Sequence, residues 1–122
     1  MTRFYFALDL RDDRQAIAEY ERWHLAENIW PEVVASIRAA GIDAMEIFRT
    51  GNRLVMAMDA GADYDPAGKA AADAANERVQ AWENLMSTFQ QPLPWAAPGQ
   101  KWLPMTRIFS LAECSTGEAA EP

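Results

Sequence analysis

Residues 44–58 read Ala-Met-Glu-Ile-Phe-Arg-Thr-Gly-Asn-Arg-Leu-Val-Met-Ala-Met, and this stretch decides the fold of the chain. Two runs rich in β-forming residues, at about 44–49 and 53–59, flank Thr50, Gly51 and Asn52. A short turn that contains glycine between two such runs is typical of a β-hairpin. The sequence therefore predicts an antiparallel pair of strands in the middle of the chain.

A third strand is predicted near the start of the chain. Residues 3–10 alternate between two faces, because successive side chains of a strand point to opposite sides of the sheet. One of these faces is wholly apolar and consists of Phe4, Phe6, Leu8 and Leu10. A last strand is expected over residues 101–111, where Pro104 indicates an edge or bulge position. Both segments are expected to join the hairpin in one sheet.

The segments between the strands carry helical signals. A first helix is expected from about 13 to 26, and Pro31 restarts a second piece that runs to about 40, because proline is tolerated in the first turn of a helix. Residues 61–68 are expected to form a loop. Asn76 is expected to cap a further helix that runs to about 90 and carries an apolar face.

The order of elements is therefore β-α-β-β-α-β, with the first helix broken. This order is typical of the ferredoxin-like α+β fold, an antiparallel sheet with helices on one face. The bare face of such a sheet must be covered, so we expect a homodimer joined sheet face to sheet face, a dimeric α/β barrel. Residues 1–111 are expected to form one domain and residues 112–122 a flexible acidic tail.

Composition argues against several classes of function. The 122 residues carry a formal net charge of −7, and 50% of them are hydrophobic. This charge disfavours nucleic acids and anionic membranes as partners, since both attract clustered Lys and Arg. The single cysteine, Cys114, cannot form an internal disulfide, and no apolar run approaches the ~20 residues of a membrane span. A cytoplasmic globular protein is therefore expected.

His24 is the only histidine in the chain and the first candidate for catalysis, since the ordinary pKa of histidine lies near neutral pH. No second histidine completes a metal site, a nucleophile triad is poorly supported, and the G-x-G-x-x-G motif is absent. What remains is proton transfer without metal or cofactor, for which Tyr20, Glu46 and Glu83 are the other candidates. The alternatives are a structural histidine and solvated surface glutamates.

Five tryptophans are many for a chain of this length. Most are expected in the core, and Trp82 lies on the apolar stripe of the last helix. Aromatic rings also stack on the C–H faces of sugars. A pocket that contains Trp, Tyr, His and Glu fits a neutral polyol better than a phosphorylated ligand, although Arg49, Arg53 and Arg107 offer anion sites. An alternative for Glu46 is an ion pair with Arg53 across the hairpin.

Two segments resemble the L-rhamnose mutarotase family. Residues 20–24, Tyr-Glu-Arg-Trp-His, and residues 29–32, Ile-Trp-Pro-Glu, match its Y-x-R-x-H and I-W-P-E pattern, and the resemblance covers about residues 3–111. It implies a ferredoxin-like homodimer that interconverts the α and β anomers of a 6-deoxy sugar and needs no cofactor. It also implies that His24 is the catalytic residue and that Tyr20 binds the sugar.

Two positions depart from the family pattern. Met45 stands where the family has a second tyrosine, and Trp82-Glu83 stands where it has two tryptophans. A branch that shares the hairpin Met-Glu-Ile-Phe-Arg-Thr-Gly-Asn-Arg is associated with L-fucose. L-Fucose is therefore preferred over L-rhamnose as the expected monosaccharide.

The expected mechanism is opening and closure of the pyranose ring. His24 is expected to be the general acid/base, with Tyr20 positioning the sugar or His24 itself, and Glu83 or Glu46 supplying a second proton relay. Met45 is expected to pack against the 6-methyl group. The residues expected to bind substrate are Tyr20, Met45, Glu46, Trp82 and Glu83. The alternatives are a non-catalytic sugar-binding module and a dimeric ferredoxin-like oxygenase.

Overall fold

A computed structural model describes residues 2–114 of the chain. Most of the expected acidic tail, residues 115–122, lies outside the described residues. The elements in chain order are β1 (Thr2–Leu10), α1 (Arg14–Trp23), α2 (Pro31–Ala39), β2 (Ile42–Thr50), β3 (Arg53–Ala60), α3 (Pro66–Ala74), α4 (Glu77–Ser87), β4 (Gln90–Gln91), β5 (Leu103–Pro104) and the 3₁₀ turn η1 (Leu111–Glu113).

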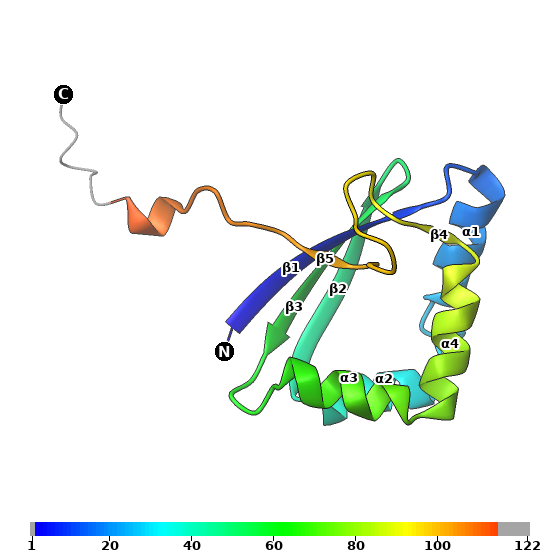
Figure 1. Ribbon diagram of the computed structural model, residues 1–122, viewed down its shortest axis with the longest axis horizontal. Helices are drawn as coiled ribbons and strands as arrows, with labels where there is room; N and C mark the ends of the chain where they lie inside the picture. The colour runs from blue at the N-terminus through cyan, green and yellow to red at the C-terminus, as the bar shows by residue number, and fades with distance from the viewer. Residues whose placement is uncertain (1, 115–122) are drawn as a thin grey trace.

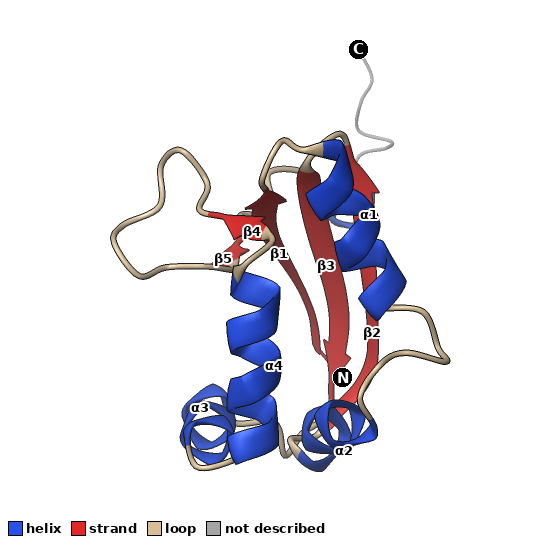
Figure 2. Ribbon diagram, turned by 90° about the vertical axis from the view of Figure 1, so that its right-hand side faces the viewer, coloured by secondary structure: helices blue, strands red, loops and turns tan. Residues whose placement is uncertain are grey.

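The strands form one antiparallel sheet in the order β2-β3-β1-β4, with β5 pairing to β1 as well. The predicted hairpin is present as β2 and β3, and the predicted first strand as β1. This strand order, with helices α1 to α4 on one side of the sheet (Figures 1 and 2), confirms the predicted ferredoxin-like α+β fold.

The two faces of the sheet differ in what covers them. Directly opposite residues of an antiparallel pair point to the same face, so Phe6 and its partner Met56 share a face with Ile47. The helices cover that face. The other face carries Tyr5 and its partner Ala57, and none of the helices α1 to α4 lies on it (Figure 1).

Helix α1 is shorter than predicted, because it ends at Trp23 instead of near residue 26. Tight turns follow, in which His24 N donates to Glu21 O and Leu25 N donates to Arg22 O. The side-chain amide of Asn28 also donates to Arg22 O at 2.8 Å, which satisfies a carbonyl that a longer helix would have used. Helix α2 then begins at Pro31, as predicted.

Two further boundaries differ from expectation. The predicted loop 61–68 is shorter, because Asp65 caps α3 by accepting a hydrogen bond from Ala67 N and Pro66 occupies the first turn. Asn76 caps α4 as predicted, accepting from Arg78 N and Val79 N. That helix ends at Ser87 instead of near residue 90, and the chain turns into β4.

The predicted last strand over residues 101–111 is wrong in its extent. Only Leu103 and Pro104 pair with β1, followed by a single bond from Met105 N to Tyr5 O at 2.9 Å. Pro104 has no N–H to continue the ladder. The chain then leaves the sheet (Figure 1), with Ile108 and Phe109 exposed by 93% and 68%.

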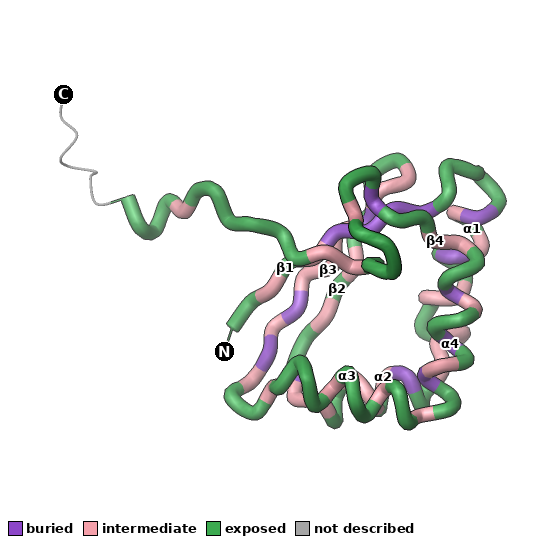
Figure 3. The backbone as a smooth tube through the Cα atoms, viewed as in Figure 1, coloured by how far each residue is buried: buried purple, intermediate pink, exposed green. Residues whose placement is uncertain are grey.

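The main core lies between the sheet and helices α1, α2 and α4, and its buried members are Leu10, Tyr20, Val33, Leu54, Trp82 and Met86. The buried positions of β1 lie in its second half, next to α1 (Figure 3). Gly41 links α2 to β2 with a φ of +91°, and a Cβ there would lie 3.2 Å from the Tyr64 backbone nitrogen. None of the described helices is long and apolar enough to cross a membrane.

Candidate active site

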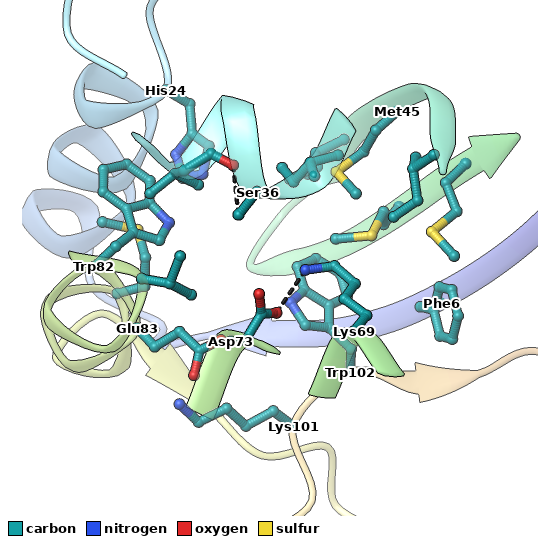
Figure 4. Close-up of a pocket in the computed structure, with 18 of the residues that line it drawn as sticks. Phe6, His24, Ser36, Met45, Lys69, Asp73, Trp82, Glu83, Lys101 and Trp102 are labelled. Carbon is teal, nitrogen blue, oxygen red and sulfur yellow. Dashed lines mark hydrogen bonds and ion pairs between the residues drawn. The ribbon is translucent and has the colours of Figure 1, made fainter. Parts of the chain in front are cut away.

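A cavity of about 680 Å³ opens between the helices and the face of the sheet that they cover. This volume is typical of small-molecule sites, which span roughly 300–1,000 Å³. Its wall on one side comes from α1 and α4, with His24, Trp82 and Glu83, and on the other side from the strands, with Met45 and Phe6 (Figure 4). Of the predicted site residues, Tyr20, His24, Met45, Trp82 and Glu83 all line this cavity.

His24 is the C-cap residue of α1, and the end of the helix fixes its ring. Its Nδ1 lies 2.7 Å from the backbone oxygen of Tyr20. A carbonyl oxygen can only accept a hydrogen bond, so Nδ1 carries the proton in the neutral ring. Nε2 is then the basic nitrogen that can take up a proton.

Burial lowers the pKa of His24 below its ordinary value of 6.5, and the hydrogen bond to the Tyr20 carbonyl partly offsets this shift. Burial lowers the pKa because it penalises the charged imidazolium. At neutral pH the ring is therefore mostly uncharged. Nε2 of the neutral ring can therefore accept a proton, which is the action of a general base.

Tyr20 lies one helical turn before His24 and is 4% exposed. The two ring centroids are 4.3 Å apart. Burial raises the pKa of Tyr20 to about 12, while the side chain of Gln90 acts in the opposite direction. The phenol therefore stays protonated at neutral pH and can donate a hydrogen bond.

Trp82 belongs both to the core and to the cavity wall. It is 7% exposed, its ring centroid lies 5.4 Å from that of His24, and Trp23 and Trp30 pack against it edge-to-face at 6.4 and 5.2 Å. The Arg78 guanidinium lies 3.9 Å from the Trp30 ring centroid. Trp30 therefore supports Trp82 from behind, and the cluster holds the imidazole against an apolar wall.

Charged side chains that sequence reasoning did not select also reach the cavity. Lys69 and Asp73, from α3, form an ion pair in its lining, and Lys101 lines it near Glu83 (Figure 4). A Lys–Asp pair four residues apart on a helix is usually a surface pair, so no local pattern indicated that this pair lines a cavity. Gln90 also lines the cavity and was not selected.

Glu46 does not reach the cavity. It lies between Met45 and Ile47, which do line it, and side chains of a strand alternate between faces. Glu46 therefore shares the opposite face with its partner Ala57. The alternative ion pair of Glu46 with Arg53 is wrong, because Arg53 binds the carboxylate of Asp9 through Nε and Nη2 at 2.8 and 3.1 Å.

Trp95 and the three arginines considered as anion sites lie outside the cavity lining. Trp95 is 65% exposed, and the Arg53 guanidinium lies 5.2 Å from its ring centroid. The three arginines considered as anion sites each pair with a carboxylate: Arg49 with Glu21, Arg53 with Asp9 and Arg107 with Glu113. These pairings leave none of the three arginines as a free anion site.

Comparison with known proteins gives a consistent result. Residues 3–111 match the family model of L-rhamnose mutarotase. The chain is 58% identical to the L-fucose mutarotase of Xanthomonas campestris pv. campestris over 113 residues, which are 93% of this chain and 90% of that protein. It is also 37% identical to a UPF0734 protein of Dictyostelium discoideum over 111 residues, 86% of each chain.

Solved structures agree on the fold. The crystal structure of L-rhamnose mutarotase from Formosa agariphila superposes with a TM-score of 0.65 at 22% identity, covering 91% of this chain and 99% of that one. Tetracenomycin F2 cyclase from Streptomyces glaucescens superposes with a TM-score of 0.54 at 12% identity, covering 90% of this chain and 98% of that one. At these identities the likeness concerns the fold alone.

Proposed function

The chain belongs to the L-rhamnose mutarotase family and is therefore a carbohydrate isomerase, and we propose that it interconverts the α and β anomers of L-fucose with His24 as the general acid/base. The choice of L-fucose rests on the 58% identity to the Xanthomonas L-fucose mutarotase. The observation that carries the choice of His24 is the fixed imidazole in the cavity wall, with Nδ1 bound to Tyr20 O at 2.7 Å.

Ring opening moves two protons. The Nε2 atom of His24 takes the proton of the anomeric hydroxyl as the bond between C1 and the ring oxygen breaks, and the ring oxygen takes a proton that Glu83 relays from water. Rotation about the C1–C2 bond and reversal of these steps give the other anomer, so protons and electrons balance over the cycle. A histidine fits this role because its pKa lies near the working pH.

The other cavity residues bind the sugar. The Tyr20 hydroxyl, which stays protonated, donates a hydrogen bond to a sugar oxygen. Trp82 packs on the apolar face of the ring and Met45 packs against the 6-methyl group. The Glu83 carboxylate accepts hydrogen bonds from sugar hydroxyls and is the nearer of the two predicted glutamates to serve as second proton relay, since Glu46 faces away.

A second copy of the chain covers the bare face of the sheet in this proposal. That face carries Tyr5 and Phe48, exposed by 44% and 56%, together with Ala57 and a charged side chain, Glu46, opposite it. Cross-strand ion pairs bound it at both ends, Arg3 with Asp59 and Arg53 with Asp9. An apolar centre within a polar rim is the usual anatomy of a protein interface.

The test is to dissolve the pure α anomer and follow its approach to equilibrium by optical rotation, or to follow anomer exchange by saturation-transfer NMR. We expect acceleration over the buffer rate with L-fucose, less with L-rhamnose, and least with D-galactose. Sugar binding by calorimetry without any acceleration would make the protein a non-catalytic binding module and refute the proposal.

A further inference from the structure

Gln90 projects into the cavity because of its place in β4. It pairs with Leu10 of β1, and Leu10 belongs to the core cluster that contains Tyr20 and Trp82. Opposite residues of an antiparallel pair share a face, so the Gln90 side chain lies on the helix side and lines the cavity. Its neighbour Gln91 pairs with Asp9 on the opposite face and is exposed.

In the protein without a bound ligand, the amide of Gln90 lowers the folding stability. Its Oε1 is buried and has no hydrogen-bond partner among the described residues, and it is the one such side-chain atom found there. A buried acceptor without a partner is destabilising, whereas an apolar side chain of the same shape avoids the penalty. Packing therefore does not explain a glutamine at this position, and a hydrogen bond to a bound ligand does.

The Gln90 amide also lies beside the Tyr20 hydroxyl. The side chain of Gln90 partly offsets the burial that raises the pKa of Tyr20, and both residues line the cavity. The Tyr20 hydroxyl, which stays protonated, and the amide of Gln90 therefore both provide hydrogen-bonding groups in the cavity lining, which suits the hydroxyl groups of a sugar.

We propose that Gln90 is a substrate-positioning residue whose Oε1 accepts a hydrogen bond from the hydroxyl on C2 or C4 of the sugar. These are the two centres at which L-fucose and L-rhamnose differ in configuration, so this contact selects between them. Rotation about the last side-chain torsion, which is soft in glutamine, turns Oε1 toward the ligand. The inference rests on the proposed function.

The test compares Gln90→Met with the matched control Gln91→Met. Methionine keeps the length of the side chain and removes the amide. We expect Gln90→Met to lower kcat/KM for L-fucose by about tenfold through KM, with kcat little changed, because a lost ground-state contact weakens binding. We also expect its Tm to equal or exceed that of the wild type, and Gln91→Met to behave as the wild type.

Deoxy sugars then locate the contact. L-Fucose lacking the C2 hydroxyl and L-fucose lacking the C4 hydroxyl are each measured with wild type and Gln90→Met. We expect the two enzymes to be equal on one of these sugars and to differ by about tenfold on the other.

Three results overturn the inference: equal activity of Gln90→Met and wild type on L-fucose, a loss of activity accompanied by a lower Tm, or the same loss on both deoxy sugars. The activity of the wild type shows which proposal has failed. If the wild type accelerates anomer exchange but one of these three results is found, only the role of Gln90 is refuted. A wild type that accelerates the exchange of no sugar refutes both.

Discussion

Replacing His24 by asparagine (H24N) separates the chemistry of the imidazole from its structural role. The amide nitrogen of asparagine takes the place of Nδ1 and can donate to the Tyr20 carbonyl, which the histidine contacts at 2.7 Å. The end of α1 is therefore preserved, whereas Nε2 is lost. We expect the variant to fold, with a stability loss of about 1 kcal/mol from the missing contacts to the Tyr20 and Trp82 rings.

The expected loss of activity follows from what remains in the cavity. The pKa of Tyr20 is raised to about 12, so its phenolate is too scarce at neutral pH to replace the imidazole as a base. General acid–base catalysis contributes roughly 10²–10⁴ in rate, which corresponds to about 3–5 kcal/mol of transition-state stabilisation. We expect kcat/KM of H24N to fall by at least about 100-fold.

The pH profile gives an independent readout. Burial lowers the pKa of His24, and the base must be neutral, so activity falls on the acid side. In the wild type, kcat/KM should decline with a midpoint below pH 6.5, after the buffer rate at each pH is subtracted. The decline should be absent from the residual rate of H24N.

Stability depends on pH through the same residue. The unfolded chain binds a proton at His24 near pH 6.5, whereas the folded chain binds it only at lower pH. Stability is therefore complete above pH 6.5 and is lost as pH falls through the folded pKa. Urea unfolding at several pH values should show this loss in the wild type and a smaller one in H24N.

The assay is saturation-transfer NMR or optical rotation with L-fucose, and the control is Leu25→Asn, next to His24 but exposed and outside the cavity lining. The control should retain wild-type activity. A folded H24N within about threefold of the wild-type rate would refute the role of His24 as acid/base.

Three further predictions concern assembly and folding. Ala57→Glu places a charge on the bare face and should convert a dimer to a monomer in light scattering. The control Ala35→Glu, on an exposed position of α2, should leave the dimer intact. A wild type that is already a monomer contradicts the proposed dimer. Gly41→Ala should lower the free energy of unfolding by about 1–2 kcal/mol, because φ is +91° and the Tyr64 backbone is 3.2 Å from the new Cβ; an unchanged urea midpoint would contradict this. Asn76→Ala removes the cap of α4 and should cost about 1 kcal/mol, measured by thermal unfolding, with Asn76→Asp as the variant that restores stability.

The sequence predicted the strands that have a strong local pattern and missed β4, which has none. Residues 3–10 alternate with period two, residues 44–58 hold two β-rich runs around a glycine turn, and both segments form the expected strands. Gln90 and Gln91 have no such pattern, since two polar residues that pair with the end of β1 carry no strand signal of their own. Pro104 marked an edge position correctly, but how far pairing continued beyond it depended on contacts that no local pattern encodes.

In the candidate site, too, local patterns placed some residues correctly, whereas others depend on how the strands pair. His24 and Tyr20 could be placed together because residues four apart share a helical face. Glu46 was expected beside Met45, although residues adjacent in a strand point to opposite faces, and the structure places Glu46 away from the cavity. Gln90 could not be found from the sequence, because its position depends on β4 pairing with β1.

The methionines of the cavity add a chemical vulnerability. Met45, Met56 and Met58 come from neighbouring strands and form its floor. Unbranched thioether side chains adapt their shape easily, which suits a wall that must accept a ring in two anomeric forms and as an open chain. The same sulfur atoms are targets of peroxide, and each sulfoxide would put a polar, bulkier group into the cavity, at Met45 in the place where we propose that the 6-methyl group packs. Oxidants should therefore inactivate the enzyme by oxidising these methionines while the imidazole of His24 stays intact. Reduction of the sulfoxides should restore activity.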